Sequence, residues 1–228
     1  MIKYDIFLFD ADNTLYDFDK ASAHALQVLF DEYGYAYNAQ VPKQLAAISA
    51  PFWKRYERGE MSDKDLQKQR FERLFEALGI THDPVAFNER YLHALGKSPF
   101  LIDGAEDICR KIAESNKQLY IVTNGFLTAQ MSRLQHSPFS QYVSDAFVSE
   151  VVGHKKPSRE YFDHVLARIP PVKKDKILMV GDSLTADVAG GNGAGIDSCW
   201  FNLRSIKNQT NIAPTYEIRK LRELERFV

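Results

Sequence analysis

The stretch Ile6-Phe7-Leu8-Phe9-Asp10-Ala11-Asp12-Asn13-Thr14 decides the fold. Its first four residues are apolar and rich in aromatic and branched side chains, which is typical of a strand buried on both faces of a parallel sheet. The run ends at two aspartates, Asp10 and Asp12, where the strand opens into a loop. Ligands of open α/β sheets bind at such strand ends. Taken alone, the pair also fits an ordinary turn, because Asp is common in turns.

Composition and charge argue against several classes of protein. The 228 residues include 29 basic and 30 acidic side chains, which gives a formal net charge of −1. No cationic block predicts binding to a nucleic-acid polymer or a membrane surface, and no apolar run approaches the length of a membrane span. Cys109 and Cys199 make no disulfide framework, and no signal-peptide pattern precedes the first strand. We therefore expect a cytoplasmic protein.

A helical insert is predicted directly after the first strand. Residues 17–96 show helical periodicity in four segments and contain no convincing strand. Ser62, followed by Asp65, is the expected start of the third segment, and Gly79 its expected end. Pro51 should kink or break the second segment. Four helices in this space predict a small bundle, with its joints at Tyr16–Asp19 and Lys97–Pro99.

The remainder of the chain alternates between helix and strand. Short apolar runs predict four further buried strands, at Leu119–Val122, Ala146–Val148, Ile177–Val180 and Ser198–Phe201. Amphipathic segments lie between them, and the tail Ile218–Phe227 is expected to form a last helix. Alternation of this kind predicts an α/β fold with a doubly wound parallel sheet. We expect a core domain of residues 1–16 and 97–228, with the four-helix cap domain at 17–96 inserted into it.

Two polar segments are candidates for phosphate binding. Thr123-Asn124-Gly125 follows a predicted strand and offers a hydroxyl and exposed backbone amides, which can cradle phosphate oxygens, although the same residues also suit a plain turn. Lys155-Lys156-Pro157 precedes a predicted helix. A lysine there can reach a phosphate as a point charge, or it can simply be solvated.

A second acidic strand end lies at Asp182. With Asp10 it can complete a set of hard oxygen ligands of the kind that Mg²⁺ prefers. Asp187 follows five residues later. It either supports the metal ligands from behind or complements the dipole of a helix start, and the residues leave both readings open.

These segments, taken in order, resemble the haloacid dehalogenase superfamily, whose members are mostly phosphohydrolases. The helical insert resembles the type 1 cap of that superfamily, so the likeness covers nearly the whole chain. It implies that Asp10 is the nucleophile and Asp12 the general acid/base. It further implies that Thr123, Asn124 and Lys156 bind phosphate, and that Asp10, Asp12 and Asp182 hold Mg²⁺ with Asp187 behind them.

The chemistry of these residues is consistent with that implication. A carboxylate nucleophile can form an aspartyl-phosphate and so divide one displacement into two easier steps. The acid at Asp12 differs from dehalogenases and phosphonatases of this fold, which resemble the pattern but lack an acid at that position. Two enzyme classes remain, a phosphomonoesterase and a phosphoglucomutase-like isomerase.

A closer resemblance concerns the substrate. Four segments look like the bacterial pyrimidine 5'-nucleotidases of the YjjG type, namely Phe9–Leu15, Pro51–Gly59, Thr123–Phe126 and Cys199–Asn202. This implies hydrolysis of a small phosphate monoester, a pyrimidine nucleoside monophosphate. The alternatives are a sugar-phosphate phosphatase, a β-phosphoglucomutase-like enzyme, or an inactive binding or scaffold protein of the same fold.

Aromatic residues near the predicted hinge and cap have two interpretations each. Phe52, Trp53 and Tyr56 have helical spacing, which favours packing in the core of the bundle over contact with a base. Tyr16 and Phe18 follow the acidic pair closely, so they are expected either beside the substrate or in hinge packing.

Overall fold

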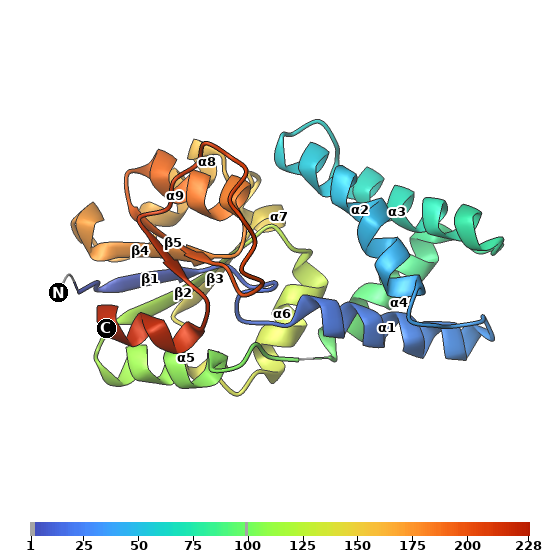
Figure 1. The fold of residues 1–228 in the computed structure, drawn as a ribbon, viewed down its shortest axis with the longest axis horizontal. Helices are drawn as coiled ribbons and strands as arrows, with labels where there is room; N and C mark the ends of the chain where they lie inside the picture. Colours follow the sequence, from blue (N-terminus) through green and yellow to red (C-terminus); the bar gives the residue numbers. More distant parts are fainter. Residues whose placement is uncertain (1–2, 99) are drawn as a thin grey trace.

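The structure is a computed structural model that describes residues 3–98 and 100–228, so Pro99 of the predicted return joint lies outside the described residues. Its centre is one parallel sheet in the order β3-β2-β1-β4-β5-β6 (Figure 1). The strands are β1 Ile6–Phe9, β2 Gln118–Thr123, β3 Asp145–Val148, β4 Ile177–Gly181, β5 Asp197–Phe201 and β6 Tyr216–Ile218. The chain builds outward from β1 to β3 and then returns to the other side of β1 at β4. The direction of strand order therefore reverses at β1, and a ligand crevice is expected there.

Strand β1 is buried on both faces, as its unbroken apolar run predicts. Phe9 is aligned with Ile121 of β2 and with Val180 of β4. Phe7 and Phe9 belong to one hydrophobic cluster and Ile6 and Leu8 to another, so alternate side chains of the strand support two separate layers. The central position of β1 therefore follows from four residues with no polar face.

Helices cover both faces of the sheet. On the Phe7 and Phe9 face lie α5 (Ala105–Glu114) and a C-terminal 3₁₀ helix (Leu221–Phe227). On the opposite face lie α8 (Arg159–Leu166) and α9 (Ala189–Ala194), as Figure 1 shows. The predicted doubly wound α/β fold is confirmed. No described helix is both long and apolar enough to cross a membrane.

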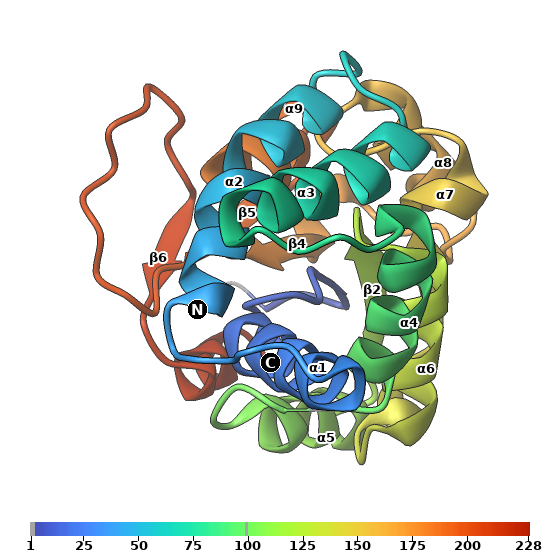
Figure 2. The same ribbon diagram turned by 90° about the vertical axis from the view of Figure 1, so that its right-hand side faces the viewer.

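Four helices follow β1 where the sequence predicts them. They are α1 Phe18–Tyr33, α2 Val41–Glu57, α3 Asp63–Leu78 and α4 Pro84–Gly96. Their apolar faces form a hydrophobic cluster of their own, which also takes in Phe126 and Ala129. Ala129 belongs to α6 (Leu127–His136), and Figure 2 shows α6 beside α4. One helix next to the sheet therefore shares its packing with the four inserted helices.

The ends of these helices agree with the sequence, and Pro51 does not break its helix. The Ser62 side chain accepts a hydrogen bond from the Asp65 amide, and Gly79 ends α3 with a left-handed φ of 65°. Pro51 lies inside α2, which continues from Val41 to Glu57 without a break. Pro51 and Ala47, four residues earlier, are both exposed. Water can therefore solvate the Ala47 carbonyl that loses its helical partner.

The C-terminal half departs from the prediction in three places. The tail is not one helix, because Ile218 ends strand β6 and only Leu221–Phe227 is helical, in 3₁₀ form. A strand of three residues pairs with the exposed edge of β5 and is too short to show a periodicity. A short helix, α7 (Ser149–Val152), was not expected, and a π-helical turn at Leu184–Val188 leads directly into α9.

We predict that Gly190→Ala destabilises the fold, whereas Gly193→Ala in the same helix does not. A Cβ at Gly190 would lie 2.2 Å from the Phe162 ring of α8, whereas a Cβ at Gly193 meets nothing within 4 Å. Overpacking costs about 1–3 kcal/mol, and an unhindered Gly-to-Ala change in a helix contributes up to about 1 kcal/mol. Urea unfolding of the two variants should therefore shift the midpoint in opposite directions. Equal shifts would show that α8 and α9 do not pack at Gly190.

Candidate active site

Side chains from three neighbouring strand ends meet at the crevice. Asp10 directly follows β1, Thr123 ends β2, and Asp182 directly follows β4. The Asp10 amide donates to the Val180 carbonyl at 2.8 Å, and the Trp200 indole of β5 donates to the Asp182 carbonyl at 2.9 Å. The sheet itself therefore fixes the backbone from which both carboxylates project.

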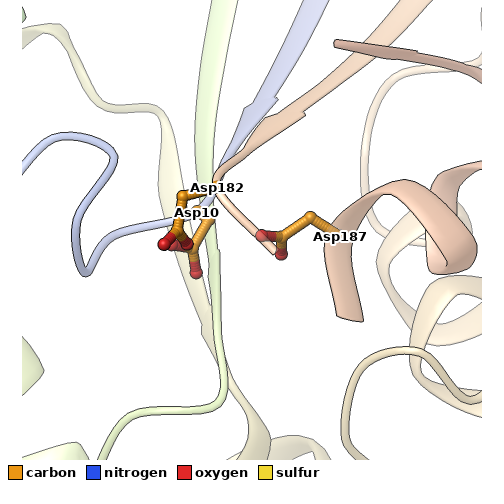
Figure 3. Close-up of side chains that lie close together, drawn as sticks. All are labelled: Asp10, Asp182 and Asp187. Atoms are coloured by element: carbon orange, nitrogen blue, oxygen red, sulfur yellow. The ribbon is translucent and has the colours of Figure 1, made fainter. Parts of the chain in front are cut away.

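Three carboxylates form one acidic cluster, shown in Figure 3. One oxygen each of Asp10, Asp182 and Asp187 lies within 4.8 Å of the others. Asp187 reaches the cluster from the π-helical turn, where its Oδ2 accepts a hydrogen bond from the Ser183 amide at 3.0 Å. A Cβ at Gly181 would lie only 2.2 Å from that Oδ2. The absence of a side chain at Gly181 therefore allows Asp187 to face the strand ends.

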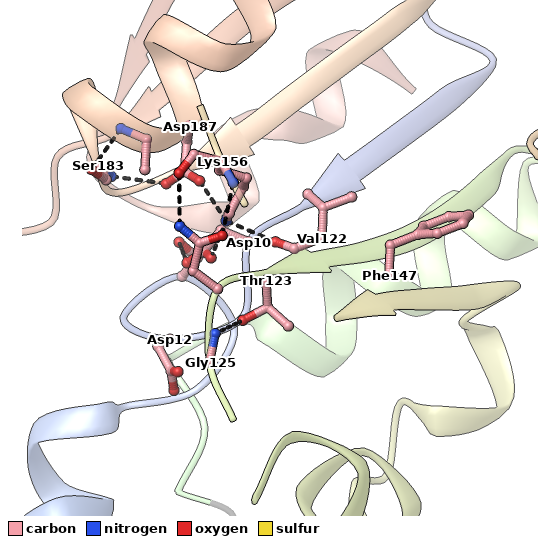
Figure 4. Close-up of polar contacts among 12 residues, drawn as sticks. Asp10, Asp12, Val122, Thr123, Gly125, Phe147, Lys156, Ser183 and Asp187 are labelled. Atoms are coloured by element: carbon pink, nitrogen blue, oxygen red, sulfur yellow. Dashed lines mark hydrogen bonds and ion pairs between the residues drawn. The ribbon is translucent and has the colours of Figure 1, made fainter. Parts of the chain in front are cut away.

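Lys156 contacts two carboxylates of this cluster, as Figure 4 shows. Its Nζ donates to Asp10 Oδ1 at 2.6 Å, to Asp187 Oδ1 at 2.7 Å and to the Val122 carbonyl at 2.8 Å. The residue is only 1% exposed. Asn124 holds its backbone on both sides, because the Asn124 amide donates to the Lys156 carbonyl at 2.9 Å and accepts from the Lys156 N–H at 2.8 Å. Asn124 thus orients Lys156.

Burial and mutual repulsion set the charge of the cluster. Burial raises the pKa of Asp10 to about 7, although Lys156 opposes the shift. Burial also raises the pKa of Asp182 well above its usual range, and the nearby charges of Asp10 and Asp187 raise it further. Burial disfavours the charge of Lys156, but the carboxylates of Asp10 and Asp187 outweigh it and raise the pKa of Lys156. Three carboxylates face one ammonium, so a divalent cation fits both the donor chemistry and the excess negative charge.

Two hydroxyls complete the surroundings of Asp10. Thr14 Oγ1 donates to Asp10 Oδ2 at 3.2 Å, so the second oxygen of Asp10 is oriented as well as the first. Thr123 Oγ1 accepts the Gly125 N–H at 3.0 Å and is buried. Because the oxygen is the acceptor in that bond, the hydroxyl hydrogen of Thr123 is left as a donor for a ligand.

Asp12 lies outside the acidic cluster, and Figure 4 shows its side chain turned away from Asp10 and Asp187. Its Oδ2 accepts from Gln130 Nε2 at 2.7 Å, and its Oδ1 forms an ion pair with the Arg133 guanidinium at 2.7 Å. The geometry therefore favours Asp187 over Asp12 as the third carboxylate beside Asp10 and Asp182. That Asp12 is a metal ligand remains a prediction from the sequence.

Gln130 and Arg133 were missed in the sequence. Both lie on the inner face of α6 and are buried, at 4% and 0% exposure. Polar residues three positions apart on a helix resemble a solvated face, and they belong to no local motif. Only their contact with Asp12 reveals them.

The site residues predicted from the sequence line a cavity of about 280 Å³ that also includes side chains of the inserted helices. Phe18 from α1, together with Trp53 and Glu57 from α2, forms part of its wall. Trp53 packs against the cluster of the four helices, as predicted, and lines the cavity as well. Tyr16 is buried against Phe139 in the cluster below the sheet, so it serves hinge packing. Charged side chains of the strand ends thus line one part of the cavity, and the aromatic side chains of Phe18 and Trp53 line another.

Comparison with known proteins identifies the family. The haloacid dehalogenase-like hydrolase model matches residues 4–195. The HAD-hydrolase YfnB of Bacillus subtilis is 39% identical over 98% of this chain and 95% of its own. The pyrimidine 5'-nucleotidases PynA of Streptococcus pneumoniae and YjjG of Escherichia coli are 36% and 33% identical, over 97% and 100% of this chain and 93% and 99% of theirs. A crystal structure of YfnB bound to magnesium aligns with a TM-score of 0.92 over 98% of each chain. The chain therefore belongs to the haloacid dehalogenase-like hydrolases, as its motifs suggest.

Proposed function

We propose that this chain is a Mg²⁺-dependent phosphomonoesterase that acts through an aspartyl-phosphate on Asp10. The observation that carries the proposal is the cluster of Asp10, Asp182 and Asp187, in which buried Lys156 pairs with Asp10 and Asp187, at the point where strand order reverses. A carboxylate nucleophile, a cation for the transferring phosphoryl group and a hard-metal donor set are all present within it.

Asp10, Asp182 and Asp187 are the residues that would hold Mg²⁺. When bound, the ion neutralises the repulsion between the carboxylate nucleophile and the phosphate and stabilises charge on the phosphoryl oxygens. Magnesium in the related YfnB structure supports the same choice of metal.

Each remaining step is assigned to a side chain. An oxygen of Asp10, oriented by Lys156 and Thr14, attacks phosphorus as the bond to the leaving oxygen breaks. Lys156 and the Thr123 hydroxyl stabilise the oxygens of the phosphoryl group. Asp12 gives its proton to the leaving oxygen, and then takes a proton from the water that attacks the aspartyl-phosphate. The second attack releases inorganic phosphate and restores Asp10.

The proposed substrates are pyrimidine nucleoside 5'-monophosphates. The aromatic side chains of Phe18 and Trp53 offer a flat, apolar wall for a base, and the Glu57 carboxylate offers an acceptor for ribose hydroxyls. Similarity to the nucleotidases PynA and YjjG supports this class of substrate. In this proposal residues 17–96 form a cap domain that grips the nucleoside, and residues 1–16 and 97–228 form the core domain that performs the chemistry.

A cytoplasmic location is also part of the proposal. Cys109 and Cys199 are both buried free thiols. Two unpaired cysteines are the usual state in a reducing compartment.

The nucleophile is tested by Asp10→Asn. An amide cannot attack phosphorus, so we expect turnover of every phosphate ester to fall below detection while the fold is retained. Acid-quenched wild-type enzyme should carry phosphate on the peptide that contains Asp10, identified by mass spectrometry. The control is Asp175→Asn, which changes an exposed acid just before the start of β4, at the opposite end of that strand from Asp182, and it should remain active. Appreciable turnover by the Asp10 variant would contradict the mechanism.

The metal site is tested by the stability of Asp182→Asn. Folded protein binds a proton at Asp182 more tightly than unfolded chain does, because its pKa is raised. The stability of metal-free protein should therefore fall as pH rises above the ordinary carboxyl range. The variant lacks this repulsion, so without metal at pH 8 its Tm should exceed that of the wild type by about 2–4 °C for each kcal/mol removed.

Addition of Mg²⁺ should reverse that order. Wild type should gain more in Tm than the variant, because only the wild type presents all three carboxylates. Calorimetric scans at pH 5 and pH 8, with Mg²⁺ and with EDTA, provide the measurement. If Mg²⁺ raised both melting temperatures equally, Asp182 would not be a ligand.

The substrate class is tested by comparing kcat/KM for UMP, dTMP, AMP, ribose 5-phosphate and glucose 1-phosphate. We expect the pyrimidine nucleotides to lead. Trp53→Leu should raise KM for UMP and leave ribose 5-phosphate, which has no base to stack, nearly unchanged. A sugar phosphate preferred about tenfold, or isomerisation of β-glucose 1-phosphate seen by NMR, would overturn the nucleotidase assignment and leave the Asp10 chemistry intact.

A further inference from the structure

Two aspartates separated by one residue have quite different surroundings. Asp10 contacts Lys156 and the acidic cluster, whereas Asp12 contacts Gln130 and Arg133 of α6. Figure 4 shows the two carboxylates pointing in different directions. Asp12 leaves the same strand end as Asp10, but its carboxylate accepts from Gln130 and pairs with Arg133 instead of meeting Lys156.

The Arg133 side chain is fully buried between Asp12 and Tyr16. Its guanidinium lies 4.7 Å above the Tyr16 ring, and its backbone carbonyl accepts a hydrogen bond from Ser137 Oγ at 2.6 Å. Ser137 Oγ lies in turn 2.9 Å from the Tyr16 hydroxyl. Tyr16 is also paired with Asp12 through the backbone. Arg133, Ser137 and Tyr16 thus form a closed frame around the loop that carries Asp12.

Gln130 depends on a second structural detail. A Cβ at Gly125 would lie 2.0 Å from Gln130 Nε2 and 3.1 Å from Asp12 Oδ2. Any larger residue at position 125 would therefore displace the Gln130 amide from Asp12. The Gly125 loop, which was expected to cradle phosphate or to form a plain turn, also makes room for this contact.

The two possible positions of Asp12 have different chemical consequences. In the acidic cluster it would be a fourth carboxylate, and it would bind the metal ion that the cluster attracts. A carboxylate bound to a dication is a poor proton carrier, because the cation favours its unprotonated form. Beside α6 the carboxylate remains outside the coordination sphere, and Asp12 still lines the cavity that would hold the substrate.

We propose that Gln130 and Arg133 are positioning residues that keep the Asp12 carboxylate out of the metal's coordination sphere and so reserve it for proton transfer. The inference rests on the proposed phosphatase function. Gln130 and Arg133 touch neither the phosphoryl group nor the metal in this scheme and act through Asp12.

The first measurement compares two esters that differ in their leaving group. Phenyl phosphate and p-nitrophenyl phosphate have nearly the same shape, but phenolate is the more basic leaving group and needs more proton donation. We expect Gln130→Leu and Arg133→Met to lower kcat/KM about tenfold more for phenyl phosphate than for p-nitrophenyl phosphate. A tenfold difference is smaller than the loss of about 10²–10⁴-fold that removal of the acid/base itself causes. Asp12→Asn provides the reference for that larger loss.

The variants have matched controls. Arg133→Lys keeps a cation and should restore part of the lost selectivity. Arg70→Met removes another buried arginine, 2% exposed, which hydrogen-bonds to Asn88 and lies over aromatic rings of the four helices. Arg70 has no contact with Asp12, so its loss should affect the two esters equally. Gln130→Leu preserves side-chain volume and carries the test if Arg133→Met does not fold.

The second measurement is metal binding without turnover. Isothermal titration with Mg²⁺ should show tighter binding by several-fold in Arg133→Met and Gln130→Leu, because the freed Asp12 can join the cluster. The gain in Mg²⁺ affinity should disappear when Asp12→Asn is added to either variant. Equal losses on both esters together with unchanged Mg²⁺ affinity would overturn the inference. Failure of the wild type to hydrolyse either ester would instead refute the proposed function, and the titration would still decide where Asp12 points.

Discussion

The structure depends on the contact of one buried ammonium with two carboxylates. Lys156 Nζ lies 2.6 Å from Asp10 and 2.7 Å from Asp187, and it also donates to the carbonyl of Val122 in β2. These bonds connect the ends of β1 and β2 and the π-helical turn after β4. If Lys156 were neutral or absent, the carboxylates would be buried without a counter-charge, which costs several kcal/mol. The location of Lys156 therefore decides whether the Asp10 and Asp187 carboxylates can be buried side by side.

The contact does not neutralise the site. Asp182 joins Asp10 and Asp187, so negative charge exceeds positive charge, and burial raises the pKa of both Asp10 and Asp182. A sequence selected only for stability would avoid this repulsion. A site that must attract a divalent cation and then an anionic phosphate benefits from it, because the bound cation removes the strain. In the proposed metal site, this repulsion would lower the stability of the metal-free protein and favour metal binding.

Asp10 and Asp12 have different partners in the structure. Asp10 contacts Lys156 and belongs to the acidic cluster, whereas Asp12 contacts Gln130 and Arg133. In the proposed mechanism these surroundings separate a nucleophile from an acid/base without any change of residue type. Helix α6 also packs against α4, so the residues that hold Asp12 belong to the helix that joins the sheet to the inserted helices.

The sequence by itself determined the features that depend only on neighbouring residues in the chain. The unbroken apolar run Ile6–Phe9 predicts a central strand, and caps such as Ser62 and Gly79 predict the helix ends, because these signals act within one element. Asp10, Asp182 and Lys156 were candidates because each stands at or just after a strand or before a helix. The tail at Ile218 was misread and Pro51 does not break α2, since pairing at a sheet edge and solvation of a carbonyl depend on neighbours in space.

Tertiary structure alone decided how the candidates combine. The position of Asp187 in the cluster depends on the missing Cβ of Gly181, and the direction of Asp12 depends on Gln130 and Arg133, which lie more than a hundred residues further along the chain. No periodicity or capping motif contains such pairs, because they arise when separate elements pack together. Local patterns fix which chemical groups reach the crevice, and packing between distant elements fixes which group each of them faces.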